Sequence, residues 1–298
     1  MYLRKIFLVC FAVFTFTCLM ACNSSSEIND RQKEAPMTES DYTIKVRMGE
    51  STDLLINQNP KLFSQYQSGT SVGFIRPNVD MNEEKKIKII FFDKNENQSL
   101  KLESIENLLF VSDSNYKKYG ITDISLEIPV DDASEIKDKK VYLAFEKLIK
   151  NLNLSGWKVF YYHGDPRIFG EESFKLNLLN DRGSLDGYYL DNYEAWMKYS
   201  EILEINSLEF YNNGNYLTVS FRTGIDHYII DMKFASTFSN YFYRYDEDIR
   251  DKEWATLLKN DLSKWQNERK LTEKKLKSEQ YIINENYKDP EIWEYMKQ

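Results

Sequence analysis

An uncharged apolar run near the amino terminus limits how much of this 298-residue chain contributes to a folded core. Arg4 and Lys5 precede the run, and residues 6–21 carry no charge. The run is about 16 residues long, whereas a helix that crosses a membrane needs about 20. A basic start followed by a short apolar segment is typical of a secretory signal peptide. We therefore predict a signal peptide over residues 1–21 and expect the fold to be built from the chain beyond Ala21.

The predicted signal peptide ends in a motif that contains a cysteine. Leu19-Met20-Ala21-Cys22 precedes a polar run that starts at Asn23, and it resembles the lipobox of bacterial lipoproteins. In that family the cysteine thiol, here Cys22, receives a diacylglyceryl group, and the leader is cut before it. The resemblance implies a lipid anchor at Cys22, because two or more acyl chains hold a protein stably at a membrane. An uncleaved anchor and a secreted protein in which Cys22 is incidental are the alternatives.

Residues 22–40 are predicted to form a lipidated cysteine followed by a flexible tether. The segment has almost no large apolar side chains, as expected for a disordered stretch. A tether of about 18 residues has a root-mean-square reach of roughly 20–25 Å. Asn23 stands where an aspartate favours inner-membrane retention in some bacterial lipoproteins, so the resemblance implies the periplasmic face of the outer membrane.

The charge and cysteine content of the remaining chain exclude some partners and some stabilising bonds. Removing Arg4 and Lys5 takes the formal net charge from −8 to −10. Acidic and basic residues are mixed along the chain, which argues against binding to nucleic acid and to anionic lipid headgroups. Cys10 and Cys18 lie in the predicted leader, so no disulfide can form once Cys22 is lipidated. Stability is therefore expected to come from burial, and aromatic residues make up 15% of the chain.

Alternating apolar and polar residues predict a β-rich region over residues 41–153. Residues 42–48 alternate in this way, and further strands are expected at 71–76, 86–93, 100–105, 108–111 and 121–128. Turn-forming residues separate these strands and no long helical period interrupts them, so we expect an antiparallel sheet. Val141, Phe145, Leu148 and Leu152 recur at helical spacing and predict a helix before a loose domain boundary near residue 153.

Residues 154–298 are predicted to form an α+β region with a long helix. A strand is expected at 156–162, short helices at 173–179 and 192–203, and a hairpin at 208–221 followed by a strand at 225–234. From residue 251 to about 284, large apolar residues recur at helical spacing among many charged ones, and residues 289–298 are expected to dock as a final turn. The predicted fold class is therefore α+β, with antiparallel β-sheets, short helices and a long C-terminal amphipathic helix.

The chain lacks the motifs of common catalytic sites. Its two histidines, His163 and His227, are far apart in sequence, and no His-Glu-x-x-His pattern, Gly-x-Ser-x-Gly elbow or phosphate-binding glycine loop occurs. Asp246-Glu247-Asp248 is more typical of a solvated loop than of an ion site. We therefore predict no catalytic residue, no metal and no cofactor.

Residues 163–173 form an irregular segment of unusual content. It follows an aromatic strand, and Asp165 and Arg167 flank a proline between two glycines. One interpretation is a structural turn in which Arg167 pairs locally or covers a helix end. The other is a rigid loop that presents Arg167 and nearby aromatic residues to a partner, because arginine, tyrosine and tryptophan are enriched at interface centres.

The second region also resembles a known family. The combination of Gly156-Trp157, Gly164-Asp165-Pro166-Arg167-Ile168-x-Gly170-Glu171-x-Ser173, Trp196 and the strands at 208–221 is similar to lipid-anchored immunity proteins. That family protects bacteria against antibacterial effectors that neighbouring cells deliver to the periplasm. The resemblance implies a non-catalytic inhibitor that occludes a lipase-type or wall-degrading effector. The candidate partner-binding residues are Trp157, Asp165, Arg167 and Trp196.

These observations lead to one hypothesis and two alternatives. The hypothesis is a lipoprotein that faces the periplasm and binds and neutralises a toxic effector protein. A carboxylate-based envelope hydrolase is one alternative, and a cleft with two carboxyl groups about 5–10 Å apart would favour it. A structural envelope lipoprotein is the other.

Overall fold

The computed structural model describes residues 43–60, 62–63, 72–77, 87–92, 98–180 and 183–296. These residues all belong to one unit that spans residues 38–298. The predicted signal peptide, Cys22 and the predicted tether lie outside the described residues.

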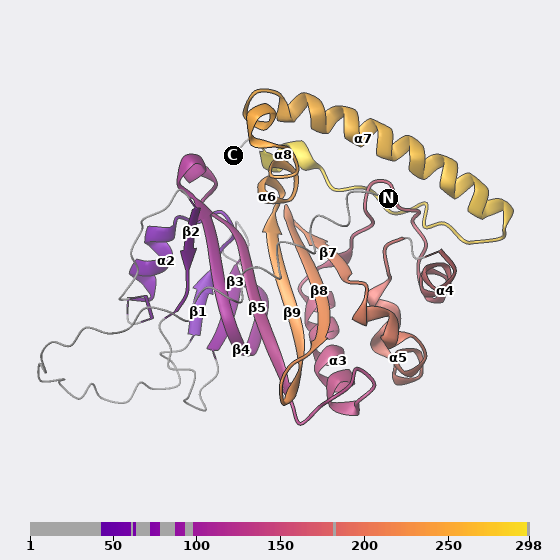
Figure 1. Ribbon diagram of the computed structural model, residues 1–298, viewed down its shortest axis with the longest axis horizontal. Coiled ribbons are helices and arrows are strands. Elements are labelled where there is room, and N and C mark those ends of the chain that lie inside the picture. The colour runs from indigo at the N-terminus through magenta and orange to yellow at the C-terminus, as the bar shows by residue number, and fades with distance from the viewer. Residues whose placement is uncertain are drawn as a thin grey trace, which may run out of the picture. The chain divides into compact units, whose positions relative to one another are not determined.

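The described residues form one nine-stranded sheet with helices packed against it (Figure 1). The strand order is β1-β3-β4-β5-β9-β8-β7-β6, with β2 paired to β4 beside this path. β1 runs parallel to β3, and the other pairs between described strands are antiparallel. With the long helix α7 near the C-terminus, this arrangement confirms the predicted α+β class. The strands are β1 (Thr43–Val46), β2 (Val72–Ile75), β3 (Ile87–Phe92), β4 (Gln98–Asp113), β5 (Ile121–Asp131), β6 (Lys158–Val159), β7 (Leu208–Asn212), β8 (Asn215–Thr223) and β9 (His227–Ser236).

The predicted regions 41–153 and 154–298 contribute strands to the same sheet. β5, from the first region, pairs with β9, from the second, over nine consecutive positions from Asp123↔Ala235 to Asp131↔His227. Residue 153 itself lies near the end of α3 (Lys139–Leu154).

β4 is one bent strand where the sequence predicts two, at 100–105 and 108–111. Ser104 and Asn107 have positive φ angles of 59° and 48°, and the pairing with β5 shifts register between Glu106 and Leu109. The first half of β4 pairs with β3, and the second half pairs with β5 and β2. The resulting curvature brings Phe91 of β3 against Phe234 of β9, with ring centroids 4.4 Å apart, although two strands separate β3 from β9.

The β7–β8 hairpin forms where its alternating strands and Gly-containing turn predict it. Asn213 and Gly214 have positive φ angles of 45° and 83°, as a tight two-residue hairpin turn requires. The Gly214 carbonyl accepts hydrogen bonds from the backbone N–H and Oγ1 of Thr237, both at 2.8 Å. The ring of Tyr295 lies where a side chain on Gly214 would project, 2.2 Å from an ideal Cβ position. Only glycine therefore fits this turn.

α3 and α5 (Tyr193–Tyr199) bury their apolar faces in a large core beside the sheet. Asp138 begins α3 by accepting a hydrogen bond from the Lys140 N–H (2.8 Å). Inward-facing side chains then recur along the helix at the predicted spacing. Trp196 of α5 packs on Phe145 of α3 and on Phe221 of β8, with ring centroids 4.7 and 5.9 Å apart.

A second apolar cluster lies on the other face of the sheet. Tyr216 belongs to it, whereas the adjacent Leu217 points to the opposite face because side chains alternate along a strand. α6 (Thr237–Phe242), α7 (Glu247–Ser278) and α8 (Ile292–Met296) supply most of the other buried side chains of this cluster and gather at one end of the sheet (Figure 1). α8 confirms the predicted final turn. The long helix begins four residues earlier than predicted and ends at Ser278, and its buried residues are Leu258, Arg269, Glu273 and Leu276.

The sequence does not predict two short helices, α2 (Thr52–Gln58) and α6, because the spacing of their apolar residues is only weakly periodic. α2 is started by Ser51, whose Oγ accepts a hydrogen bond from the Leu54 N–H (3.2 Å). α6 follows β9 directly and is aromatic on several sides, so its sequence continues the apolar character of the strand. Ser236 caps it by accepting from the Ser239 N–H (3.2 Å). The 173–179 helix is α4, which runs over Glu171–Asn180.

Candidate functional site

The predicted loop at 163–173 is fastened to α7 by a two-point ion pair. Arg167 Nε donates to Glu273 Oε1 (2.8 Å), and Arg167 Nη2 donates to Oε2 (2.7 Å). The backbone N–H of Arg167 also donates to Oε1 (3.0 Å). Burial alone would raise the pKa of Glu273, but the hydrogen bonds from Arg167 lower it below its usual value. The carboxylate is therefore held ionised mainly by Arg167, 106 positions away in sequence, with a further contribution from the charge of Arg269.

A second arginine joins α7 to two other segments. Arg269 Nη1 donates to both carboxylate oxygens of Asp289 (2.8 and 2.9 Å). Its Nη2 donates to the carbonyls of Tyr161 and Tyr162 (3.3 and 2.7 Å). Because the side chain of Arg269 is only 5% exposed, these bonds satisfy a buried charge. Arg269 of α7 therefore links Tyr161 and Tyr162, which follow β6, to Asp289 in the segment after the helix.

His163 is part of this buried network. Its Nε2 lies 2.8 Å from Tyr241 Oη, its Nδ1 lies 3.5 Å from Asp289 Oδ1, and its ring is parallel to that of Trp265. Tyrosine, histidine and aspartate are thus in line, as in a proton relay. His163 and Tyr241 are 4% and 1% exposed, so both rings are enclosed within the protein, whereas Asp289 at the end of this line is 23% exposed.

Asp165 and Asp186 fix the backbone around the same loop. Ser184 Oγ donates to Asp165 Oδ2 (3.0 Å) and accepts from the Tyr162 N–H (3.1 Å). The Gly170 N–H donates to Asp186 Oδ2 (2.8 Å). Burial raises the pKa of Asp186, although these backbone hydrogen bonds oppose the rise. The loop is therefore held at both ends, and its charged groups are engaged within the protein.

The four candidate partner-binding residues do not share one surface. Trp196 is fully buried, and its Nε1 donates to the Ile136 carbonyl (3.1 Å). Trp157 is 4% exposed and packs on Phe234, with ring centroids 5.7 Å apart. Asp165 and Arg167 lie together in the loop and are half-buried. The Trp196 side chain is thus unavailable to a partner while the fold is intact, and Trp157 exposes only a small part of its surface.

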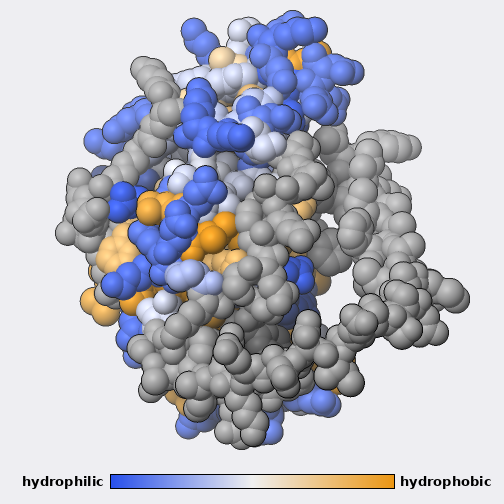
Figure 2. Space-filling view, turned by 90° about the vertical axis from the view of Figure 1, so that its left-hand side faces the viewer, coloured by the Kyte–Doolittle hydropathy of each residue, from blue (hydrophilic) through white to orange (hydrophobic). Residues whose placement is uncertain are grey.

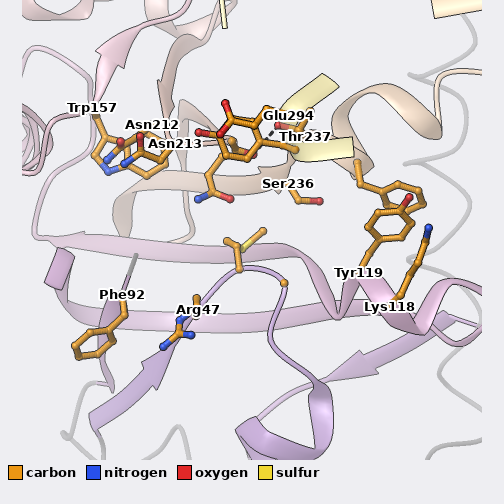
Figure 3. Close-up of a pocket in the computed structure, with 16 residues that line it drawn as sticks. Arg47, Phe92, Lys118, Tyr119, Trp157, Asn212, Asn213, Ser236, Thr237 and Glu294 are labelled. Atoms are coloured by element: carbon orange, nitrogen blue, oxygen red, sulfur yellow. Dashed lines mark hydrogen bonds between the residues drawn. The ribbon is translucent and has the colours of Figure 1, made fainter. Parts of the chain in front are cut away.

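A cavity of about 300 Å³ opens between the ends of β1 and β3 and the β7–β8 hairpin (Figure 3). Arg47 and Phe92 lie on one side of it, and Asn212 and Thr237 lie opposite. Asn212 Nδ2 donates to the Ser155 carbonyl (2.9 Å), and Thr237 Oγ1 already bonds the hairpin turn. These wall groups are therefore used to hold the hairpin.

A larger cavity of about 670 Å³ runs along the outer edge of β6. Tyr188 Oη donates to the Trp157 carbonyl (2.6 Å), and Tyr287 Oη accepts from the Tyr161 N–H (3.3 Å). Of the four candidate partner-binding residues, Trp157 is the one that lines this cavity. The sequence did not indicate the other lining residues, because the fold brings them together from distant segments. The lining residues are Asn153, Trp157, Lys158, Val159, Tyr161, Phe169, Asp186, Tyr188, Tyr211, Asn284, Asn286, Tyr287, Lys288, Asp289 and Pro290.

Apolar surface is also visible on the side of the sheet where α2 and β2 lie (Figure 2). Leu54 of α2 is 44% exposed and Phe74 of β2 is 62% exposed. A cavity of about 550 Å³ beside β1 and α2 is lined mostly by polar and charged residues, with Phe92 as its one aromatic residue. The β6 edge combines a larger cavity with several aromatic rings, backbone polar groups and charges. We therefore take the β6-edge cavity as the candidate functional site.

Glu209 of β7 is a buried carboxyl group near the loop, and burial raises its pKa to about 7. Its oxygens accept hydrogen bonds from Ser207 Oγ and Thr218 Oγ1, both at 2.8 Å, which oppose but do not cancel the effect of burial. The side chain is 7% exposed. Glu209 is therefore a buried acid whose carboxyl oxygens are bonded to neighbouring side chains.

This shifted pKa predicts a loss of stability as the pH rises. The ordinary pKa of a glutamate is 4.5, and that of Glu209 in the folded protein is about 7. Between these pH values the folded protein keeps a proton that the unfolded chain releases, so stability falls as the pH rises. Glu209→Gln removes the titration. From urea unfolding at pH 4.5 and 7.5, we expect the free energy of unfolding of the variant to fall by about 3 kcal/mol less than that of the parent protein. Equal losses in the two proteins would contradict the assignment.

The described ranges contain no group of three or more histidine, cysteine, aspartate and glutamate side chains arranged to hold a metal ion. Within the same ranges, no helix is both long and apolar enough to cross a membrane. Comparison of the chain with protein-family models, with curated proteins and with solved structures finds no match.

Proposed function

We propose that this chain is a lipoprotein of the bacterial envelope that binds and neutralises a toxic effector protein without catalysis. Lipid on Cys22 holds the chain at the outer membrane, and the tether at 22–40 lets the folded body reach a partner in the periplasm. Leu19-Met20-Ala21-Cys22 supports the anchor.

One observation carries the binding part of the proposal, namely the β6-edge cavity. Tyrosine rings line it, and the loop beside it is held rigid by the Arg167–Glu273 pair. Rigid, tyrosine-rich surfaces are favourable for protein binding, because little side-chain freedom is lost when a partner docks. The geometry therefore favours recognition over chemistry.

The hydrolase alternative receives less support. It requires two carboxyl groups that face a substrate across a cleft. Of the acidic residues at the β6-edge cavity, Asp186 accepts hydrogen bonds from backbone N–H groups and Asp289 is paired with Arg269. Glu209, whose raised pKa suits a general acid, is enclosed by neighbouring side chains.

The proposal is tested by replacing the lipidated residue, Cys22→Ser. We expect mass spectrometry of the parent protein to show a diacylglyceryl group on Cys22 and no leader, and membrane fractions to contain it. The variant is expected in the soluble fraction. A strain without the protein is expected to lose survival against sibling cells that deliver the effector. The parent gene is expected to restore survival, and the variant to restore it only in part.

Two outcomes would contradict separate parts of this proposal. An unmodified thiol at Cys22 in the parent protein would remove the anchor. Unchanged survival of the deletion strain against its siblings, with no effector bound by the purified protein, would remove the neutralising function and favour a structural lipoprotein.

A further inference from the structure

We propose that the outer edge of β6 binds an extended, acidic segment of the partner protein by strand pairing. The inference rests on the proposed function as a protein binder and specifies the chemistry of the partner. Three features of the edge carry it: the direction of its backbone groups, the tyrosine hydroxyls on both sides, and the charges around the cavity.

The register of β6 turns the backbone of Val159 away from the sheet. Phe160 donates its N–H to the Glu209 carbonyl (2.8 Å), and Val159 lies opposite Phe210. In an antiparallel pair, hydrogen-bonded and non-hydrogen-bonded positions alternate. Because Phe160 is a hydrogen-bonded position, the N–H and C=O of Val159 point outward. Val159 also lines the β6-edge cavity.

Two tyrosine hydroxyls occupy the outward backbone groups on either side of Val159. Tyr188 bonds the Trp157 carbonyl, and Tyr287 bonds the Tyr161 N–H. The two hydroxyls thus satisfy the Trp157 carbonyl and the Tyr161 N–H. The backbone N–H and C=O of Val159 lie between these two bonded groups. A half-buried sheet edge of this kind is a template for one residue of an added strand, since main-chain hydrogen bonds give affinity in such complexes.

The charges at the cavity favour an acidic ligand. Its two aspartates are engaged: Asp186 with backbone N–H groups and Asp289 with Arg269. Lys158 and Lys288 are exposed, and neither forms an ion pair or a side-chain hydrogen bond with any residue that the structure describes. The charge available to a ligand is therefore positive, on lysines from two segments 130 residues apart.

The cavity also accepts the alternate side chains of an extended segment. Its volume of about 670 Å³ exceeds what one residue fills, and the Phe169 ring beside the edge is 44% exposed. In strand-addition complexes, pockets for alternate side chains give specificity. A segment that alternates apolar and acidic residues matches both the aromatic lining and the lysines.

The test uses the folded protein and a defined probe, the peptide acetyl-Val-Glu-Val-Glu-Val-amide. Its control is the same peptide with lysine in place of glutamate. Binding is followed by the amide signals of the isotope-labelled protein in solution NMR. We expect the glutamate peptide to produce its largest amide shift at Val159, and the lysine peptide to bind at least about tenfold more weakly.

Paired variants test the charges independently. Lys158→Glu with Lys288→Glu is expected to weaken the binding of the glutamate peptide at least about tenfold. Lys259→Glu with Lys270→Glu makes the same change in net charge on exposed positions of α7, and it is expected to leave binding nearly unchanged. All four residues are exposed, so the variants are expected to fold.

Any of three results would overturn the inference: no binding of the glutamate peptide, shifts centred away from Val159, or equal binding by both charge-reversed proteins. None of these depends on the anchor or on survival. If the deletion strain still loses survival, the neutralising function stands and the partner docks elsewhere. If the peptide binds but survival is unchanged, the edge is a peptide site and the proposed function is wrong.

Discussion

Replacing Arg167 by alanine is expected to lower the free energy of unfolding by about 3 kcal/mol, because it leaves a buried carboxylate without its main partner. Glu273 is 5% exposed and accepts three hydrogen bonds from Arg167, two of which come from the side chain. The backbone N–H remains in the variant, and Arg269 lies nearby, so part of the stabilisation of the carboxylate survives. Equilibrium urea unfolding at pH 7.5 measures the difference.

Arg222→Ala is the matched control for this prediction. Arg222 also contacts two carboxylate groups, Glu127 and Asp231, each at 2.7 Å, but its side chain is 46% exposed. Pairs exposed to water contribute little, so the expected cost is about 0–1 kcal/mol. Equal costs for the two alanine variants would contradict the structural role of Arg167. Combining Arg167→Met with Glu273→Leu is expected to recover much of the lost stability, because no buried charge remains.

Replacing Trp196 by alanine is expected to cost about 4 kcal/mol, since it removes a fully buried ring and leaves a cavity. The ring packs on Phe145, Phe221 and Tyr142, so α3, α5 and β8 all lose contacts. The Ile136 carbonyl also loses its donor. Urea unfolding followed by far-ultraviolet circular dichroism measures this change without depending on tryptophan fluorescence.

A conservative substitution separates packing from hydrogen bonding at the same position. Trp196→Phe keeps an aromatic ring in the core but removes the N–H donor, and we expect a cost of about 1–2 kcal/mol. A cost below about 1 kcal/mol for the alanine variant would show that the core closes around the gap. It would also mean that Trp196 was not required for packing.

Elements with strong local patterns were predictable from the sequence, because their signals lie within a few residues. The β7–β8 hairpin is indicated by alternation around a Gly-containing turn, and α3 by apolar residues at helical spacing. The bend within β4 was not predictable, since Ser104 and Asn107 adopt positive φ angles that few non-glycine residues favour. α6 was missed because its aromatic sequence continues that of β9.

The candidate site was predictable only in part, because its residues meet through long-range pairing. The loop at 163–173 was recognisable from its composition, but its partner Glu273 lies 106 residues away. Similarly, Tyr188 and Tyr287 reach the edge of β6 from separate segments. No local pattern connects these positions. Sequence reasoning can therefore name an unusual loop, whereas only the fold shows whether its charges face a partner or the interior.

The second apolar cluster has a consequence for how the protein matures. Phe160, which follows β6, belongs to it together with residues of β8, α6 and α7. Ile292 and Met296, which complete it, lie roughly fifty residues after Phe242 at the end of α6. Until α8 packs against these elements, aromatic surface on this face stays open to water and to other unfolded chains. A chain truncated within α7 is thus expected to yield a species that chaperones retain and proteases remove.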